Sequence, residues 1–215
     1  MIVNSFVTGI ISVAIGYLLG SIPSAYIVTR LAVRKDIREL GGGNVGGYNV
    51  FREVGVWPAA AVAISDIGKG ASVIAITHWL LDLSPIFVML AGLAAVVGHN
   101  WMVWLRFSGG KGMGATIGAL AVIMPAYGYW QGLLIYFGII VVAFVITRNL
   151  SSSLGTGLLF LPLVVWFSTR SVTATVMAII LGLVAAVKFY HTAREAWARA
   201  ETKKDFIFDR RRDGK

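Results

Sequence analysis

Apolar residues run along this chain in long stretches, separated by short segments rich in glycine, proline or charge. A helix that crosses a bilayer needs about 20 mostly apolar residues, within a range of about 17–25. Seven stretches approach that length, at about 4–28, 56–81, 85–105, 113–127, 130–147, 154–168 and 171–189. The pattern predicts an all-α membrane protein with seven transmembrane helices.

The region 113–147 admits two interpretations. One long bent helix would account for its apolar character as well as two shorter helices would. However, the segment Pro125-Ala126-Tyr127-Gly128 contains the residues that typically form a turn. We therefore expect two helices that meet at this turn.

The distribution of Lys and Arg predicts the orientation of the spans. Cytoplasmic segments of membrane proteins are enriched in these residues. Basic residues fill the first, third and fifth loops and the C-terminal segment, whereas the second and fourth loops contain none and the sixth has only Arg170. The N-terminal segment has no Lys or Arg before its apolar stretch, so it lacks the charged start of a secretory signal peptide. We expect an uncleaved first span, the N-terminus outside and the C-terminus in the cytoplasm.

Composition supports a membrane protein. The chain is 57% hydrophobic and 13% charged, whereas soluble domains have about 45–50% apolar and about 25% charged residues. The absence of cysteine excludes disulfides, cysteine nucleophiles and cysteine-ligated metals. The net charge of +9 is explained by the orientation signal, so we expect no nucleic-acid partner. The sequence predicts one transmembrane domain at 1–190 and a basic cytoplasmic tail at 191–215 that contacts anionic membrane lipids.

Two segments between the predicted spans are rich in glycine, at 41–47 and 109–114, and basic residues lie beside both. Glycine lets successive backbone N–H groups approach an oxyanion because it has no Cβ. The second segment leads into a predicted helix, whose N-terminus adds partial positive charge. Glycine also serves close helix packing in membranes, but such glycines are usually spaced along a helix. The clusters therefore favour phosphate binding by cytoplasmic loops at 41–52 and 106–114.

Several ionisable residues lie within or beside the spans. Asp66 and Lys69 are three residues apart, on one face of the second predicted helix. Charged groups at membrane depth are costly and normally face a partner or a watery cavity. The pair could stabilise the bundle or support a site. His99 and His191 could likewise be structural or belong to a site, and both approach the predicted cytoplasmic surface. His78 lies near the opposite surface, where we expect a structural role.

The chain contains none of the common hydrolase signatures. Neither His-Glu-x-x-His nor Gly-x-Ser-x-Gly occurs. A reaction at this site would then depend on electrostatic positioning, without a protein nucleophile. We expect no metal and no cofactor.

Four motifs stand in a particular order along the chain: Gly20-Ser21-Ile22-Pro23-Ser24-Ala25-Tyr26, Asp36-Ile37-Arg38 with 41–52, Asp66-Ile67-Gly68-Lys69-Gly70, and Gly98-His99 with Phe107-Ser108-Gly109-Gly110-Lys111-Gly112. Together they resemble the acyl-phosphate:glycerol-3-phosphate acyltransferases of the PlsY type over about the first 155 residues. The resemblance implies transfer of an acyl group from acyl phosphate to glycerol 3-phosphate, giving lysophosphatidic acid and phosphate. It also implies a bacterial inner-membrane enzyme whose active site faces the cytoplasm.

The resemblance, together with the motifs, gives a predicted site. The catalytic residues expected are Lys111, Arg52 and His191. The expected substrate-binding residues are Gly42, Gly43, Asn44, Gly46, Asn49, Asp66, Lys69, His99, Gly109, Gly110, Gly112, Ser151 and Arg194. The resemblance implies that Arg52, Lys111, Ser151 and His191 contact glycerol 3-phosphate, while the first glycine loop holds the acyl phosphate. Gly42 and Arg194 replace the serine and asparagine that are usual in that family.

A second class of function fits the same loops. A non-catalytic carrier or binding paralogue for a phosphate-bearing lipid or anion would also need glycine loops and cations. Transporters typically place their sites near the membrane midplane, on broken helices within inverted repeats. This sequence has no convincing repeat, and its predicted sites lie at one surface.

Overall fold

The computed structural model describes residues 2–199, with side chains at residues 5–190. Within these ranges the chain is helical, and its β pairing is limited to a bridge between Met102 and Ser108. Five helical segments in the described part are long and apolar enough to cross a membrane: Ser5–Val33, Val56–Leu80, Trp130–Thr147, Leu150–Thr169 and Val172–Tyr190. Two of the expected spans are shorter apolar helices, Pro85–Asn100 and Met113–Ala126.

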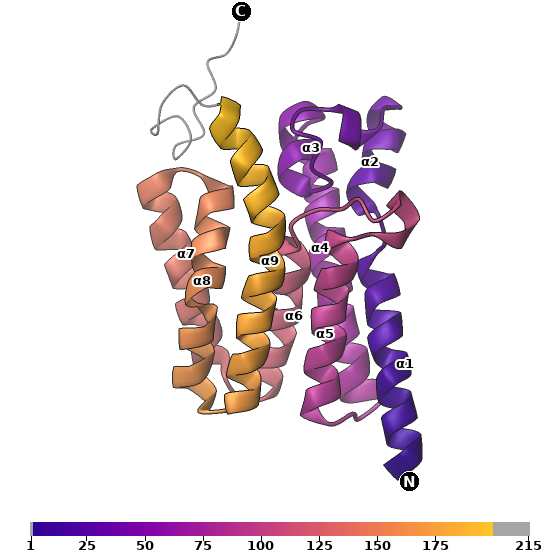
Figure 1. Cartoon of the computed structure of the whole chain (residues 1–215), viewed down its shortest axis with the longest axis vertical. Coiled ribbons are helices and arrows are strands. Elements are labelled where there is room, and N and C mark those ends of the chain that lie inside the picture. The colour runs from indigo at the N-terminus through magenta and orange to yellow at the C-terminus, as the bar shows by residue number, and fades with distance from the viewer. Residues whose placement is uncertain (1, 200–215) are drawn as a thin grey trace, which may run out of the picture. The chain divides into compact units, whose positions relative to one another are not determined.

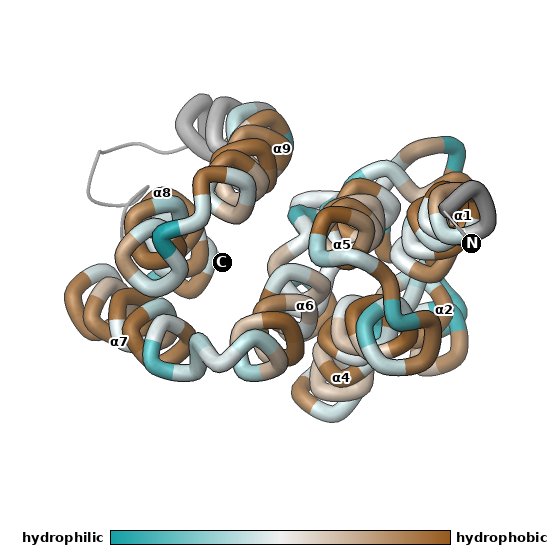
Figure 2. Tube along the Cα trace, turned by 90° about the horizontal axis from the view of Figure 1, so that it is seen from below, coloured by the Kyte–Doolittle hydropathy of each residue, from teal (hydrophilic) through white to brown (hydrophobic). Residues whose placement is uncertain are grey.

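The helices form two compact units, one within Met1–Tyr127 and one within Gly128–Lys215. In the first unit α4 packs against α6, and α1 packs against α5 (Figure 1; Figure 2). The helices of this unit are α1 (Ile2–Gly20), α2 (Ser24–Val33), α3 (Gly47–Glu53), α4 (Val56–Ala75), α5 (Pro85–Asn100) and α6 (Met113–Ala126). Short helical turns follow α2 at Ile37–Glu39, α4 at Ile76–Leu80 and α5 at Val103–Leu105.

The second unit consists of α7 (Trp130–Thr147), α8 (Leu150–Thr169) and α9 (Val172–Arg199), and α8 packs against both neighbours. The division of the region 113–147 into two helices is confirmed, because α6 ends at Ala126 and Gly128 takes a left-handed φ of +81°. The last helix continues to Arg199, which is about ten residues beyond the end of the expected span.

The first expected span is interrupted. A single helix over 4–28 was expected, but α1 ends at Gly20 and α2 begins at Ser24. Pro23 has no N–H and cannot continue the hydrogen-bond ladder. Ile22 and Pro23 lie between the two helices, and the carbonyl of Ile22 accepts from the Ser24 N–H at 3.0 Å and from Lys69 of α4 at 3.2 Å.

The third expected span ends earlier than the sequence pattern indicates. It was expected to reach residue 105, but α5 ends at Asn100. Arg106 and Phe107 have φ values of +54° and +60°, and the Phe107 N–H donates to the Met102 carbonyl. These local bonds fold the chain back and place the second glycine loop against the end of α5.

Small residues allow α4 and α6 to lie in direct backbone contact. A Cβ on Gly70 would overlap the carbonyl oxygen of Ala115, and one on Gly118 would overlap that of Ile67. Such contacts are typical of membrane helices, where association depends on close van der Waals packing. The start of α6 is thereby held against the middle of α4.

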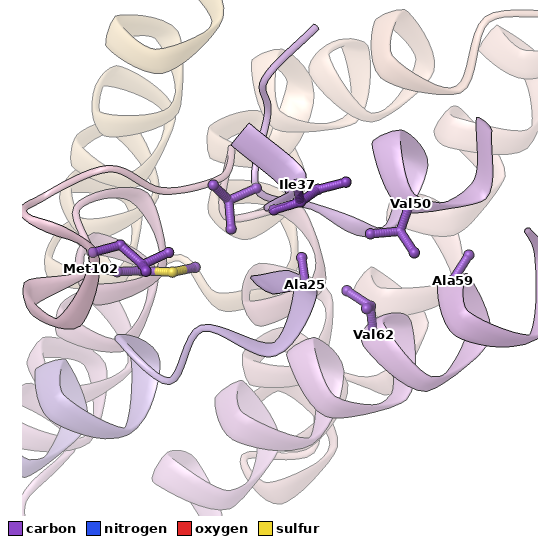
Figure 3. Packing of buried hydrophobic residues seen from close by; sticks show 8 residues of the cluster. Ala25, Ile37, Val50, Ala59, Val62 and Met102 are labelled. Atoms are coloured by element: carbon purple, nitrogen blue, oxygen red, sulfur yellow. The ribbon is translucent and has the colours of Figure 1, made fainter. Parts of the chain in front are cut away.

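An apolar cluster fixes the first glycine loop to the helices beneath it (Figure 3). Its side chains come from α2, the first loop, α3, α4 and the segment after α5. The buried members are Ala25, Ile37, Val45, Val50, Ala59, Val62, Met102 and Leu105. The first glycine loop and the segment that follows α5 therefore belong to one packed structure.

We expect Gly70→Ala to lower the free energy of unfolding by about 1–3 kcal/mol, which is typical of overpacking. The matched control is Gly68→Ala on the same helix, where a Cβ would meet nothing within 4 Å. Alanine there should be neutral or stabilising, because it favours helix by about 1 kcal/mol over glycine. Unfolding by heat or SDS in detergent measures both variants. Equal stability of the two would contradict the α4–α6 packing.

Candidate active site

The first glycine loop begins with a capped turn. The Asp36 carboxylate accepts a hydrogen bond from the Arg38 backbone N–H at 3.0 Å and pairs with the Arg38 guanidinium at 2.6 Å. The guanidinium holds the pKa of Asp36 below its usual range. It also lies 5.8 Å from the centre of the Tyr26 ring on α2. The entry to the loop is thus fixed by charge and by contact with α2.

Asn49 holds the rest of the first loop together from within. Its buried side chain donates to the carbonyls of Leu40 and Asn44 at 3.0 and 3.1 Å. Its Oδ1 accepts from the Gly42 N–H at 3.4 Å. The side chain of Asn49, which was expected to bind substrate, is therefore engaged with the loop backbone.

Left-handed backbone shapes the first loop. Gly41 and Gly43 have φ values of +56° and +72°, which are strained for residues with a Cβ. Gly42 is exposed, and a Cβ added to it would meet nothing within 4 Å. The loop thus has space for an added group at Gly42, whereas Gly46 is buried against the Asn44 side chain.

The second glycine loop lies directly on the end of α5. The Gly110 N–H donates to the His99 carbonyl at 3.0 Å. A Cβ on Gly109 would overlap the carbonyls of His99 and Asn100, and one on Gly112 would overlap the Asn100 side chain. Close packing therefore requires these glycines, in addition to any part they play in phosphate binding.

The two glycine loops meet at one point. A Cβ on Gly110 would overlap both the Val45 carbonyl oxygen of the first loop and Nε2 of His99. Gly110 is buried there, whereas the neighbouring Lys111 is only half-buried. Backbone contact thus brings together the two segments that the sequence marks as phosphate-binding.

Two of the predicted catalytic cations belong to this unit. Lys111 lies two residues before α6, whose N-terminus carries partial positive charge. Gly112, between them, takes a φ of +76° and lets the chain turn into the helix. Arg52 is exposed near the end of α3, with its guanidinium 5.8 Å from the centre of the Tyr48 ring. Each loop therefore has a cation beside it.

A buried polar cluster lies beneath the second loop. Asp66, Lys69 and His99 are 4%, 7% and 3% exposed. The Asp66 Oδ1 lies 3.0 Å from Lys69 Nζ and 3.5 Å from His99 Nδ1. The Ser24 hydroxyl donates to the same oxygen, and Lys69 Nζ donates to the Ile22 carbonyl at 3.2 Å.

Sequence reasoning missed the roles of Ser24 and of the Ile22 carbonyl. The available signal was Pro23, because a proline within an apolar stretch interrupts a helix and often stands at the start of the next one. It also gave no role to Asn100, which is fully buried against Gly112. Among the described residues, neither amide atom of Asn100 has a hydrogen-bond partner.

The remaining predicted residues belong to the second unit. Ser151 is half-buried in the first turn of α8, next to Asn149, whose side chain caps that helix through the Ser152 N–H at 3.0 Å. His191 and Arg194 lie on α9, but their side chains are outside the described residues. Among the side chains described, His, Asp and Glu form no group of three that could hold a metal ion.

Comparison with known proteins gives a consistent result. A sequence profile of the family described as glycerol-3-phosphate acyltransferase matches residues 10–199. Glycerol-3-phosphate acyltransferase 1 of Dehalococcoides mccartyi is 44% identical over 198 residues, covering 92% of this chain and 95% of the relative. A glycerol-3-phosphate acyltransferase of Bartonella henselae is 35% identical and covers 82% of each chain.

Two crystal structures of PlsY (YgiH), an integral membrane glycerol 3-phosphate acyltransferase, have the same fold. The glycerol 3-phosphate form superposes with a TM-score of 0.80 at 26% identity, covering 91% of this chain and 94% of that one. The lysophosphatidic acid form gives a TM-score of 0.77 at 25% identity. With five long apolar helices and this similarity, the chain is an integral, multi-pass membrane protein. It belongs to the glycerol-3-phosphate acyltransferase family.

Proposed function

We propose that this chain transfers an acyl group from acyl phosphate to the sn-1 hydroxyl of glycerol 3-phosphate. The products are lysophosphatidic acid, used in phospholipid synthesis, and inorganic phosphate. Beside the family relationship, one observation carries the proposal: two glycine loops, each with a neighbouring cation, meet where Gly110 touches the Val45 carbonyl. A reaction between two phosphate-bearing substrates needs two such anion sites in contact.

The proposed chemistry uses no protein nucleophile. The sn-1 hydroxyl oxygen attacks the acyl carbonyl carbon, the bond from that carbon to the phosphate oxygen breaks, and phosphate leaves. The hydroxyl proton passes to the phosphate of the donor. The protein aligns the two substrates and stabilises the negative charge that develops on the carbonyl oxygen.

The glycines of the first loop serve the acyl phosphate, and the second loop serves glycerol 3-phosphate, to which Arg52 at the end of the first loop also contributes. The first loop, over Gly42, Gly43, Asn44 and Gly46, holds the acyl phosphate. Glycerol 3-phosphate is bound by Lys111 and Arg52. The family resemblance implies Ser151, His191 and Arg194 as further contacts of this substrate. The N-terminus of α6 follows Lys111 by two residues. Its partial positive charge and the Lys111 ammonium attract the same phosphate, so the helix strengthens phosphate binding at this position.

The proposed topology has seven spans, with the N-terminus outside and the active site facing the cytoplasm of a bacterial cell. Five of these spans are the long apolar helices, and the two shorter apolar helices, α5 and α6, supply the other two crossings. Residues 1–190 then act as one transmembrane domain, and the basic tail at 191–215 contacts the anionic cytoplasmic leaflet. Both glycine loops follow helices that end at the face where Lys and Arg are concentrated, in agreement with the positive-inside rule.

Purified protein supplied with acyl phosphate and glycerol 3-phosphate should form lysophosphatidic acid and release phosphate. We expect Lys111→Ala to lower kcat/KM by about 100-fold or more, as removal of one transition-state donor does. Lys35→Ala is the matched control, because it removes the same charge from an exposed position outside the glycine loops. It should retain activity within about twofold, the effect of a weak exposed charge.

A folded sample that yields no lysophosphatidic acid above background would refute the proposed reaction. Exchange of labelled glycerol 3-phosphate across proteoliposomes, without chemical conversion, would favour the carrier. The acceptor is tested by comparing polyol phosphates with phosphate release as the readout.

Asn49→Asp should damage donor binding selectively. The carboxylate places an acceptor against the carbonyls of Leu40 and Asn44, and both hydrogen bonds to them are lost. We expect the KM for acyl phosphate to rise about tenfold, the effect of roughly one lost and unreplaced hydrogen bond. Gln131→Glu adds the same charge at the start of α7, at a position that belongs to neither loop. Steady-state kinetics that show an equal rise in the KM for glycerol 3-phosphate would contradict the separate roles of the loops.

A further inference from the structure

The polar cluster around Asp66 connects the helices to the second glycine loop. Its carboxylate accepts from Ser24 at the start of α2 and pairs with Lys69 on its own helix. On a third side it lies 3.5 Å from Nδ1 of His99, in the last turn of α5. The Cβ of Asp66 is also the atom nearest to a Cβ added on Gly114, at 2.6 Å. One side chain thus touches α2, α5 and the first turn of α6.

His99 is held between Asp66 and the second loop. Nδ1 of its imidazole faces the carboxylate, while Nε2 lies against the α-carbon of Gly110. Its own carbonyl accepts the Gly110 N–H at 3.0 Å. The ring and the backbone carbonyl of His99 therefore both support Gly110, the residue immediately before Lys111.

Charge balance favours a neutral imidazole in this place. Lys69 compensates Asp66, so a protonated His99 would add an unbalanced buried charge, which is costly. The carboxylate then meets the Nδ1 side of the ring at 3.5 Å, and the Nε2 side faces the loop. A carboxylate that fixes the tautomer and orientation of a histidine in this way is a common supporting arrangement.

We infer that Asp66, acting through His99, is a positioning residue for the second glycine loop, and that it controls the binding of glycerol 3-phosphate without touching it. In its kinetic form the inference depends on the proposed function. The first loop has its own internal support in Asn49, whose hydrogen bonds all run to that loop and its flanking turn. A change at Asp66 should therefore disturb the second loop and leave the first loop in place.

The test compares Asp66→Asn with Ser24→Ala in the full-length protein. Asparagine retains the size of the side chain but loses the charge that orients His99, whereas Ser24→Ala removes a different partner of the same oxygen. Amide hydrogen exchange reports on each loop by separate peptides, covering 105–114 and 37–53. Kinetics report the KM for each substrate, and thermal unfolding reports global stability.

In Asp66→Asn we expect exchange at 109–112 to be at least tenfold faster, with exchange at 37–53 unchanged. We expect the KM for glycerol 3-phosphate to rise about tenfold, as for a lost charge-assisted contact, and that for acyl phosphate to stay within about twofold. Ser24→Ala should lower the thermal midpoint and leave both loop readouts as in the parent protein. Unchanged exchange at 109–112 in folded Asp66→Asn, or an equal increase in both loops, would overturn the inference.

If Asp66→Asn does not fold, a second variant, His99→Asn, tests whether Asp66 positions the second glycine loop through His99. In His99→Asn the amide can occupy the place of Nδ1 and retain the contact with Asp66, but it lacks the atoms that lie against Gly110. It should show the same selective loosening at 109–112, and unchanged exchange there would overturn the inference. Exchange needs no turnover. A parent protein without acyl transfer would therefore refute the proposed function, while the exchange comparison would still decide the role of Asp66.

Discussion

The carboxylate of Asp66 is buried within α4, and the first unit must supply partners that balance its charge. Placing a charged side chain at the centre of a bilayer helix costs about 2.5–3.5 kcal/mol on insertion scales. The cost is offset here by partners from three directions: Lys69, the Ser24 hydroxyl and His99. Each partner requires a local feature of the fold. Ser24 is available because α2 restarts after Pro23, and His99 because α5 ends one residue later.

Close packing extends this support to the second glycine loop. The second glycine loop can lie on His99 and Asn100 only because it has no side chains at the points of contact. Amides held in this way are oriented before a substrate arrives. Such preorganised dipoles contribute to catalysis because they need no rearrangement as charge develops. The glycines serve packing, and in the proposed function they serve electrostatics as well, although the sequence alone had set these two interpretations against each other.

Features that depend on local chemistry could be predicted from the sequence. The turn at Pro125 to Gly128 and the grouping of cations with glycine loops both follow from the properties of adjacent residues. Features that depend on distant partners could not. The commitment of Asn49 to the backbone depends on carbonyls 5 to 12 residues away, and the support of Asp66 depends on Ser24 and His99 of other helices. The proposed roles of His191 and Arg194 still rest on the family resemblance.

The break between α1 and α2 bears on how the chain enters the membrane. The Ile22 carbonyl is satisfied in part by the ammonium of Lys69, which is synthesised 47 residues later. At about 5–20 residues per second, translation takes several seconds to supply that partner. Lipid offers no substitute hydrogen bond in the meantime. Until then the Ile22 carbonyl accepts only the local Ser24 N–H, so the contact that fixes the break between α1 and α2 to α4 forms only after α4 has been synthesised.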